Sequence, residues 1–143
     1  MEKNFTVACA ESCTGGLVMS RLTDFAGASA YVKGGVVAYV NEIKNKILNV
    51  KAETLEKFGA VSAQTAEEMA TNVRKIFSAT IGLSTTGVAG PDKSEGKPVG
   101  LVFVAIAGEN FSEVKEFQFS GSRSEIKDQA AEAAFELLMR HTI

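Results

Sequence analysis

The hydroxyl of Ser12 stands where the sequence changes from an apolar run at residues 5–10 to a helical pattern at residues 17–22. A tight turn between a strand and a helix directs backbone N–H groups towards one point, where the helix dipole also favours negative charge. A serine in that turn therefore has a place beside it for an anion or a developing oxyanion. An ordinary turn, with glycines at positive φ and a Ser or Thr helix cap, fits the same residues.

The base that would activate this serine is not a histidine. The only histidine, His141, is third from the end of the sequence, where a frayed terminus would position it poorly. A Ser-His-Asp triad is therefore not expected, and a metal site built on several histidines is excluded. If Ser12 is a nucleophile, a lysine, a tyrosine or a carboxylate must take its proton.

Lys44 and Tyr39 meet that requirement. Lys44 falls in the first turn of a helix that Asn41 is expected to cap, where the positive end of the dipole lowers the pKa of an amine. Burial would lower this pKa further, until the neutral amine can accept a hydroxyl proton. Tyr39, at the preceding strand end, is expected to hydrogen-bond both Ser12 and Lys44 and to relay the proton. A solvated helix lysine and a half-buried strand tyrosine are the structural alternatives.

Two further segments carry groups that bind anions. Arg123 opens the last helix, where a guanidinium beside helix N–H groups forms a clamp for phosphate or carboxylate; a surface arginine paired with Glu125 is the alternative. The glycine-rich residues 87–92 match neither a Walker loop nor a dinucleotide fingerprint, and they predict a turn at which backbone approaches a ligand. The composition of residues 93–97 predicts a mobile cover.

The composition is that of one globular domain, residues 1–143. The chain has 143 residues, 45% of them hydrophobic, and a net charge of −2, so we expect no nucleic-acid partner. No apolar run reaches the length of a membrane span and no signal peptide precedes the first strand, so we expect no membrane association. Cys9 and Cys13 match neither a disulfide nor a zinc spacing, which favours a reducing, cytoplasmic location.

Strand and helix patterns alternate along the chain. Strands are expected at residues 5–10, 32–39, 80–86, 99–107 and 111–119, and helices at residues 17–22, 41–48, 52–58, 62–77 and from 122 onwards. This order predicts the α/β class, with a central sheet covered by helices on both faces and made mixed by the last two strands. Ser62 and the box Ser122-x-x-Glu125 are expected to cap the last two helices.

Ligands of such sheets bind beyond the carboxyl ends of the strands. Four turns compete for that edge, at residues 12–16, 39–44, 85–92 and 120–123. If all four converge, they form one pocket that is rich in backbone N–H donors and holds a serine, a tyrosine, a lysine and an arginine.

Six motifs occur in order along the sequence. They are Ala10-Glu-Ser-Cys-Thr-Gly-Gly16, Gly34-Gly-Val-Val-Ala-Tyr39-x-Asn-Glu-x-Lys44, Gly59-Ala-Val-Ser62, Gly87-x-Ala-Gly-Pro-Asp92, Lys97-Pro-Val-Gly100 and Phe119-Ser-Gly-x-Arg123. Together they resemble the CinA C-terminal domain family over nearly the whole chain, and the enzymatic members of that family are nicotinamide-nucleotide amidohydrolases. The resemblance implies deamidation of nicotinamide mononucleotide to nicotinate mononucleotide and ammonia. It also implies a homodimer and a three-layer α/β/α sandwich around a mixed, mostly parallel sheet.

Carried over residue by residue, the resemblance implies Ser12 as nucleophile, Lys44 as its base and Tyr39 as an assisting residue. Arg123 matches the substrate-binding arginine, and the turn at residues 87–90 is expected to hold the 5′-phosphate with it. Further substrate-binding positions are implied at Thr14, Gly15, Gly16, Thr86, Gly87 and Gly90. Backbone N–H groups near residues 12–15 are expected to hold the oxyanion. No metal or organic cofactor is required.

Departures from the family pattern leave other functions open. Val40 stands where the family frequently has a serine, and we expect no counterpart of the helix that often precedes the first strand, which leaves a sheet face exposed or covered by a partner subunit. The alternative function is a non-catalytic nucleotide- or phosphate-binding module, or a competence- or damage-related partner module, on the same fold. A third hypothesis makes Cys13 the nucleophile, because a helix start lowers the pKa of a thiol, although no histidine is placed to assist it.

Overall fold

The computed structural model describes residues 4–142, which form one sheet of five strands and its covering helices. The strands are β1 (Val7–Glu11), β2 (Val32–Val37), β3 (Ile81–Gly87), β4 (Leu101–Ala107) and β5 (Ser112–Gln118). The helices are α1 (Leu17–Leu22), α2 (Asn41–Leu48), α3 (Ala52–Phe58), α4 (Ala63–Ile76) and α5 (Arg123–Thr142), with a 3₁₀ turn at Ala28–Ala30. Every predicted strand and helix is present, with ends close to those that the sequence indicates.

β1 lies between two parallel neighbours. The strand order is β2-β1-β3-β4-β5; β1 pairs parallel with β2 and β3, whereas β4 runs antiparallel to β3 and to β5. The carboxyl ends of β1, β2, β3 and β5 therefore meet at one edge of the sheet, together with the start of β4. The predicted mixed sheet is confirmed.

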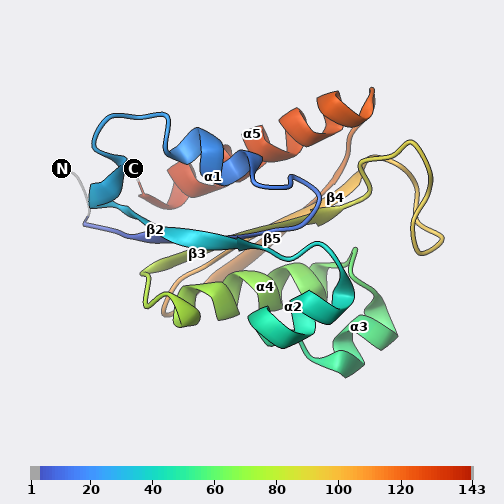
Figure 1. The fold of residues 1–143 in the computed structure, drawn as a ribbon, viewed down its shortest axis with the longest axis horizontal. Coiled ribbons are helices and arrows are strands. Elements are labelled where there is room, and N and C mark those ends of the chain that lie inside the picture. The colour runs from blue at the N-terminus through green and yellow to red at the C-terminus, as the bar shows by residue number, and fades with distance from the viewer. Residues whose placement is uncertain (1–3, 143) are drawn as a thin grey trace.

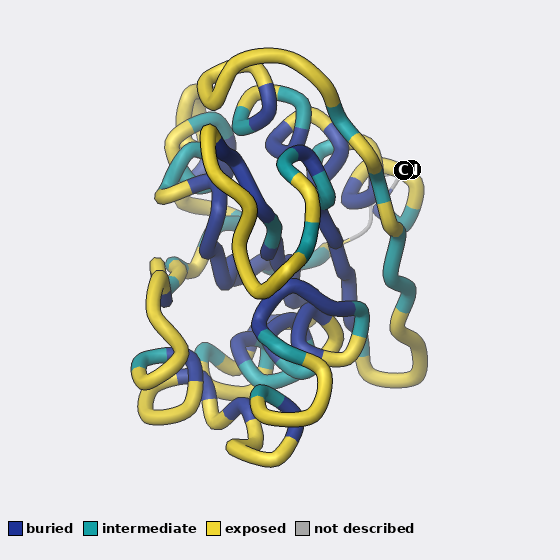
Figure 2. Tube along the Cα trace, turned by 90° about the vertical axis from the view of Figure 1, so that its right-hand side faces the viewer, coloured by how far each residue is buried: buried dark blue, intermediate teal, exposed yellow. Residues whose placement is uncertain are grey.

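Helices cover both faces of this sheet. Figure 1 shows α1 and α5 on one face and α2, α3 and α4 on the other, so the predicted three-layer α/β/α sandwich is confirmed. All five residues of β1 are buried, as expected for a strand covered on both faces, and Figure 2 shows the buried inner strands within a shell of exposed loops. Leu83 of β3 packs with Ile126 and Leu137 of α5 on one side, and Met69 and Val73 of α4 pack on the other.

The predicted caps of α4 and α5 are present, whereas that of α2 is not. Ser62 accepts a backbone N–H at the start of α4, and Ser122 and Glu125 form the reciprocal capping box at the start of α5. Asn41 does not cap α2, because Val40 takes the N-cap position and Asn41 is already the first helical residue.

Between residues 4 and 142, no helix combines the length and the apolar character that a membrane crossing requires.

Candidate active site

A cavity of about 540 Å³ lies at the edge where the strand carboxyl ends meet. Residues from all four predicted turns line it, so their predicted convergence is confirmed. The predicted site residues in its wall are Ser12, Tyr39, Lys44, Thr86, Gly87, Gly90 and Arg123. Ala60 and Val61, from the connection between α3 and α4, and Glu95, from the loop before β4, also line the wall, although the sequence predicts no site role for them.

Ser12 and Lys44 are hydrogen-bonded to each other in the wall of this cavity. The amine Nζ of Lys44 lies 2.9 Å from Oγ of Ser12 and donates to the carbonyl oxygen of Tyr39 at 2.8 Å. Ser12 follows β1 directly and Lys44 lies near the start of α2, which follows β2, so the parallel pairing of β1 with β2 brings the two side chains together. A hydroxyl in contact with a buried amine is the arrangement that a serine nucleophile with a lysine base requires.

The surroundings of Lys44 favour the neutral amine. Its side chain is 1% exposed, and burial lowers its pKa from 10.5 to about 8, while Cys13 and Glu95 act in the opposite direction. No carboxylate forms an ion pair with Lys44 within residues 4–142. About a tenth of the amine is therefore uncharged at pH 7, far more than for an exposed lysine, and can accept a proton.

Gly15 and Gly16 give the turn after Ser12 its shape. Their φ angles are 61° and 108°, in the left-handed region that favours glycine. The Thr14 hydroxyl donates to the carboxylate of Glu11. Thr14, Gly15 and Gly16 all lie outside the cavity wall, so the structure does not support the substrate contacts predicted for them. They build the turn that carries the serine.

The Glu11 carboxylate occupies the start of α1, where the sequence predicts a binding place for an anion. The Glu11 carboxylate accepts the backbone N–H groups of Gly16 at 3.2 Å, Val18 at 2.9 Å and Met19 at 3.0 Å. The N-cap position belongs to Gly16, so the predicted Ser or Thr cap is absent from this helix. A substrate anion must therefore bind elsewhere in the cavity.

Cys13 offers the site its backbone rather than a reactive thiol. Burial raises the pKa of the thiol to about 12, which leaves little thiolate at neutral pH and argues against a Cys13 nucleophile. The N–H groups of Cys13 and Thr14 donate to no oxygen within residues 4–142, whereas the N–H of Ser12 donates to the Thr85 carbonyl at 3.0 Å. Of these two residues only Cys13 lines the cavity, so its N–H is the donor that the turn offers to an oxyanion.

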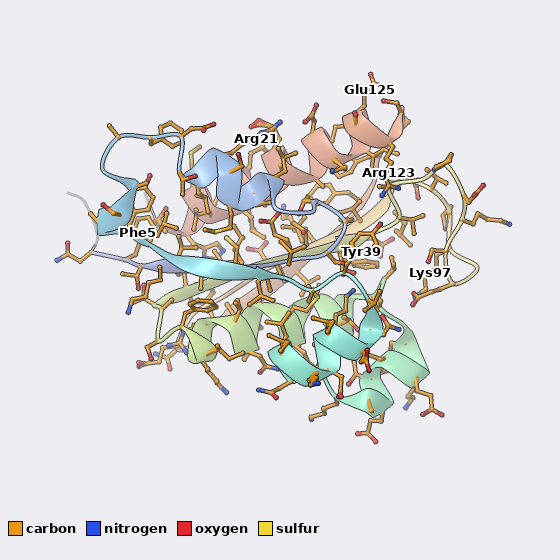
Figure 3. All side chains as sticks on the ribbon, viewed as in Figure 1. Phe5, Arg21, Tyr39, Lys97, Arg123 and Glu125 are labelled. Carbon is orange, nitrogen blue, oxygen red and sulfur yellow. The ribbon has the colours of Figure 1, made fainter. Side chains whose placement is uncertain are left out.

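The hydroxyl of Tyr39 faces Arg123. Arg123 donates to this hydroxyl at 3.0 Å and also to the carbonyl oxygen of Gly90. The hydrogen bonds expected from the Tyr39 hydroxyl to Ser12 and Lys44 are absent from the described part of the chain, and only the Tyr39 carbonyl contacts Lys44. Tyr39 is 58% exposed, and Figure 3 shows it at the same end of the molecule as Arg123. The pair stands at the mouth of the cavity.

Residues 93–97, here called the strap, are anchored beside the cavity, whereas their composition predicts a mobile cover. The Glu95 carboxylate accepts the N–H groups of Ala60 at 2.8 Å and Val61 at 3.1 Å. Nζ of Lys97 donates to the carbonyl oxygen of Phe58, the last residue of α3, at 2.7 Å and to that of Val61, in the connection between α3 and α4, at 2.5 Å. Two charged side chains thus hold the strap against that connection.

Thr86 and Gly87 form the wall at the end of β3. The Thr86 hydroxyl is buried and donates to the carbonyl oxygen of Ala60 at 2.8 Å, so it supports the fold. A Cβ atom on Gly87 would lie 2.7 Å from the carbonyl oxygen of Leu101, so a glycine is needed for the close contact between β3 and β4.

Within residues 4–142, no group of three His, Cys, Asp or Glu side chains is placed to hold a metal ion.

The fold and this cavity define an α/β/α sandwich domain with a site at the carboxyl ends of its strands. The model of the CinA C-terminal domain matches residues 1–142, and the chain belongs to this family.

Curated relatives share about half of their residues with this chain. A CinA-like protein of Syntrophomonas wolfei is 49% identical over 136 residues, which cover 94% of this chain and 33% of that protein. A Bacillus subtilis protein named as competence-damage inducible is 48% identical over 139 residues, which cover 97% of this chain and 33% of that protein. The chain thus spans about a third of the length of the curated relatives it matches.

Solved structures carry the same fold. A competence/damage inducible protein from Agrobacterium tumefaciens superposes with a TM-score of 0.92 at 41% identity, covering 96% of this chain and 85% of that one. A CinA superfamily protein from Enterobacter cloacae superposes with a TM-score of 0.94 at 32% identity, covering 96% and 82% of the two chains.

Proposed function

We propose that this domain hydrolyses the carboxamide of nicotinamide mononucleotide to give nicotinate mononucleotide and ammonia. The supporting observation is the 2.9 Å contact between Oγ of Ser12 and Nζ of Lys44, an amine whose pKa is lowered to about 8. This pair supports the reaction class, a serine-based hydrolysis. The identity of the substrate is taken from the resemblance to nicotinamide-nucleotide amidohydrolases.

The first half of the reaction makes an acyl-enzyme. Neutral Lys44 takes the proton of the Ser12 hydroxyl while Oγ forms a bond to the carboxamide carbon. The tetrahedral intermediate then loses its C–N bond, and the protonated Lys44 gives its proton to the departing nitrogen, which leaves as ammonia. Because the Tyr39 hydroxyl bonds Arg123, the proton passes directly between Ser12 and Lys44 in this scheme.

The second half of the reaction restores the enzyme. A water molecule gives a proton to Lys44 and attacks the ester carbon, the bond from that carbon to Oγ breaks, and Lys44 returns the proton to Ser12. The N–H group of Cys13, which lines the cavity and has no oxygen acceptor within residues 4–142, holds the oxyanion in both halves. One such donor contributes about 3 kcal/mol to the stability of the transition state.

The cavity mouth takes the phosphate end of the substrate. A volume of about 540 Å³ is within the range of small-molecule sites, which is roughly 300–1,000 Å³. Arg123 supplies a guanidinium there, close to the turn at residues 87–90. The start of α1 does not bind the phosphate in this scheme, because Glu11 already accepts its N–H groups. In this scheme the 5′-phosphate binds at Arg123 and the carboxamide reaches Ser12.

The test is ammonia release from nicotinamide mononucleotide by the purified domain, beside Ser12→Ala, Lys44→Ala and Cys13→Ala. We expect the first two variants to lose at least about 10³-fold in rate and Cys13→Ala to keep its activity. Activity that survives Ser12→Ala removes the proposed nucleophile. A wild type that binds the nucleotide without releasing ammonia supports the non-catalytic binding module instead.

A further inference from the structure

Glu11 is a buried carboxylate that the proposed reaction does not use. It is the last residue of β1, it is 1% exposed, and the other residues of the strand are apolar. Within residues 4–142 no lysine, arginine or histidine forms an ion pair with it. A buried carboxylate without a cation is unfavourable unless hydrogen-bond donors surround it.

Four donors surround this carboxylate, and all come from the segment that follows β1. Oε1 accepts the Thr14 hydroxyl and the N–H groups of Gly16 and Val18, and Oε2 accepts the N–H of Met19. These N–H groups belong to the first turn of α1, where a side chain at the N-cap position normally binds them. Gly16, with a φ of 108°, has no side chain to do so, and the cap comes from the sheet.

Ser12 is held between Glu11 and β3. Its N–H donates to the Thr85 carbonyl at 3.0 Å, and the Thr85 hydroxyl lies 2.7 Å from that of Thr14. Thr14 therefore links the Glu11 carboxylate to β3 across the turn. The turn cannot shift on the sheet edge without breaking these bonds, and Lys44 is attached to the same edge through β2.

We infer that Glu11 is a positioning residue for Ser12, an inference that rests on the proposed function. By capping α1 from inside the sheet, its carboxylate fixes the turn so that Oγ of Ser12 stays in hydrogen-bonding contact with Lys44. It also keeps the Cys13 N–H in the cavity wall without an oxygen acceptor. Glu11 does not line the cavity, so its loss affects the rate of the chemical steps rather than substrate binding.

The test replaces Glu11 by Gln and uses Glu68→Gln as the matched control. Glu68 accepts the N–H of Lys51 and the Thr54 hydroxyl at the start of α3, outside the cavity wall. For Glu11→Gln we expect kcat of ammonia release to fall about 10–100-fold, with KM and the pH midpoint of the rate unchanged. For Glu68→Gln we expect wild-type kcat.

A second pair of variants removes and restores one bond of the same cap. Thr14→Val deletes the hydroxyl that links Glu11 to β3, and Thr14→Ser keeps it. We expect kcat to fall in the first variant and to return in the second.

Wild-type kcat in a folded Glu11→Gln protein, or equal losses in Glu11→Gln and Glu68→Gln, overturns the positioning role. If Glu11→Gln does not fold, the Thr14 pair decides in the same way. If the wild type releases no ammonia, the proposed function fails. The positioning of Ser12 by Glu11 is then tested separately, by crystal structures of the variants. We then expect the contact between Ser12 and Lys44 to be broken in Glu11→Gln or Thr14→Val, and an unchanged 2.9 Å contact overturns the inference.

Discussion

Nζ of Lys44 lies 2.9 Å from Oγ of Ser12, although 32 positions separate the two residues in the chain. The contact depends on the parallel pairing of β1 with β2, because each residue follows the end of one of these strands. Lys44 is also buried, which makes its amine a weaker base than an exposed lysine and leaves it uncharged closer to neutral pH. One structural relationship thus supplies both the contact and the protonation state that the proposed reaction needs.

The rate of ammonia release should depend on pH through Lys44. Only the neutral amine accepts the Ser12 proton, so kcat/KM should rise about tenfold per pH unit in acid and level off above the pKa of about 8. Initial rates measured between about pH 6 and pH 9 at a fixed ionic strength test this expectation. A rate that is constant over this range rules out a lysine base.

Lys44→Met should stabilise the fold while it abolishes activity. The Lys44 pKa is about 8 in the folded protein and near its usual 10.5 when unfolded, so the unfolded chain binds more protons between these values. The wild type is therefore penalised most below about pH 8, and the penalty is relieved as the pH rises towards 10.5.

Urea unfolding of the two proteins measures this effect. At neutral pH the free energy of unfolding of Lys44→Met should exceed that of the wild type by about 2 kcal/mol. The difference should shrink as the pH rises. A variant that is less stable than the wild type at neutral pH contradicts the unfavourable burial of a charged amine.

Arg123 should determine affinity for the phosphate. Arg123→Ala should raise KM for nicotinamide mononucleotide about 10–100-fold and change the rate with the unphosphorylated riboside much less. Tyr39→Phe, which removes the hydroxyl that Arg123 contacts, should raise KM by a smaller factor and leave the pH midpoint in place. If Tyr39→Phe instead shifts the pH midpoint of the rate, the Tyr39 hydroxyl takes part in proton transfer, as the sequence predicts.

Lys97 should hold the strap in its position beside the cavity. Lys97→Met removes the hydrogen bonds from Nζ to the carbonyl oxygens of Phe58 and Val61, so the amides of Ala60 and Val61 should exchange with deuterium faster and KM should rise a few-fold. Lys93→Met is the control, because Lys93 lies in the same strap, is exposed, and makes no side-chain hydrogen bond within residues 4–142. Equal exchange rates in the two variants would show that Lys97 does not anchor the strap.

The positions of Ser12 and Lys44 could be predicted because local patterns determine them. An apolar run before each residue indicates a strand, the following pattern indicates a helix, and parallel strands place such turns at one edge. The capping residues Ser62 and Ser122 were predictable for the same reason, since each cap depends on a few neighbouring residues.

Other parts of the site depend on contacts that no local pattern encodes. The Glu95 carboxylate binds the amide of Ala60, 35 positions away, and nothing in either segment indicates the pairing. The hydroxyl of Tyr39 turns to Arg123, 84 positions away, although the Tyr39 carbonyl contacts Lys44. Glu11 contacts residues close in sequence, but its role follows from the direction of one side chain, which the alternation of a fully buried strand does not specify.

The most direct test of the account is an NMR titration of the Lys44 amine, followed through the shift of its Cε in protein with labelled lysine. The signal is assigned by its absence from Lys44→Met. We predict a midpoint near pH 8, equal to the midpoint of kcat/KM for ammonia release. A midpoint at the usual lysine value of about 10.5 would contradict the proposal that Lys44 takes the proton of Ser12 as a neutral base.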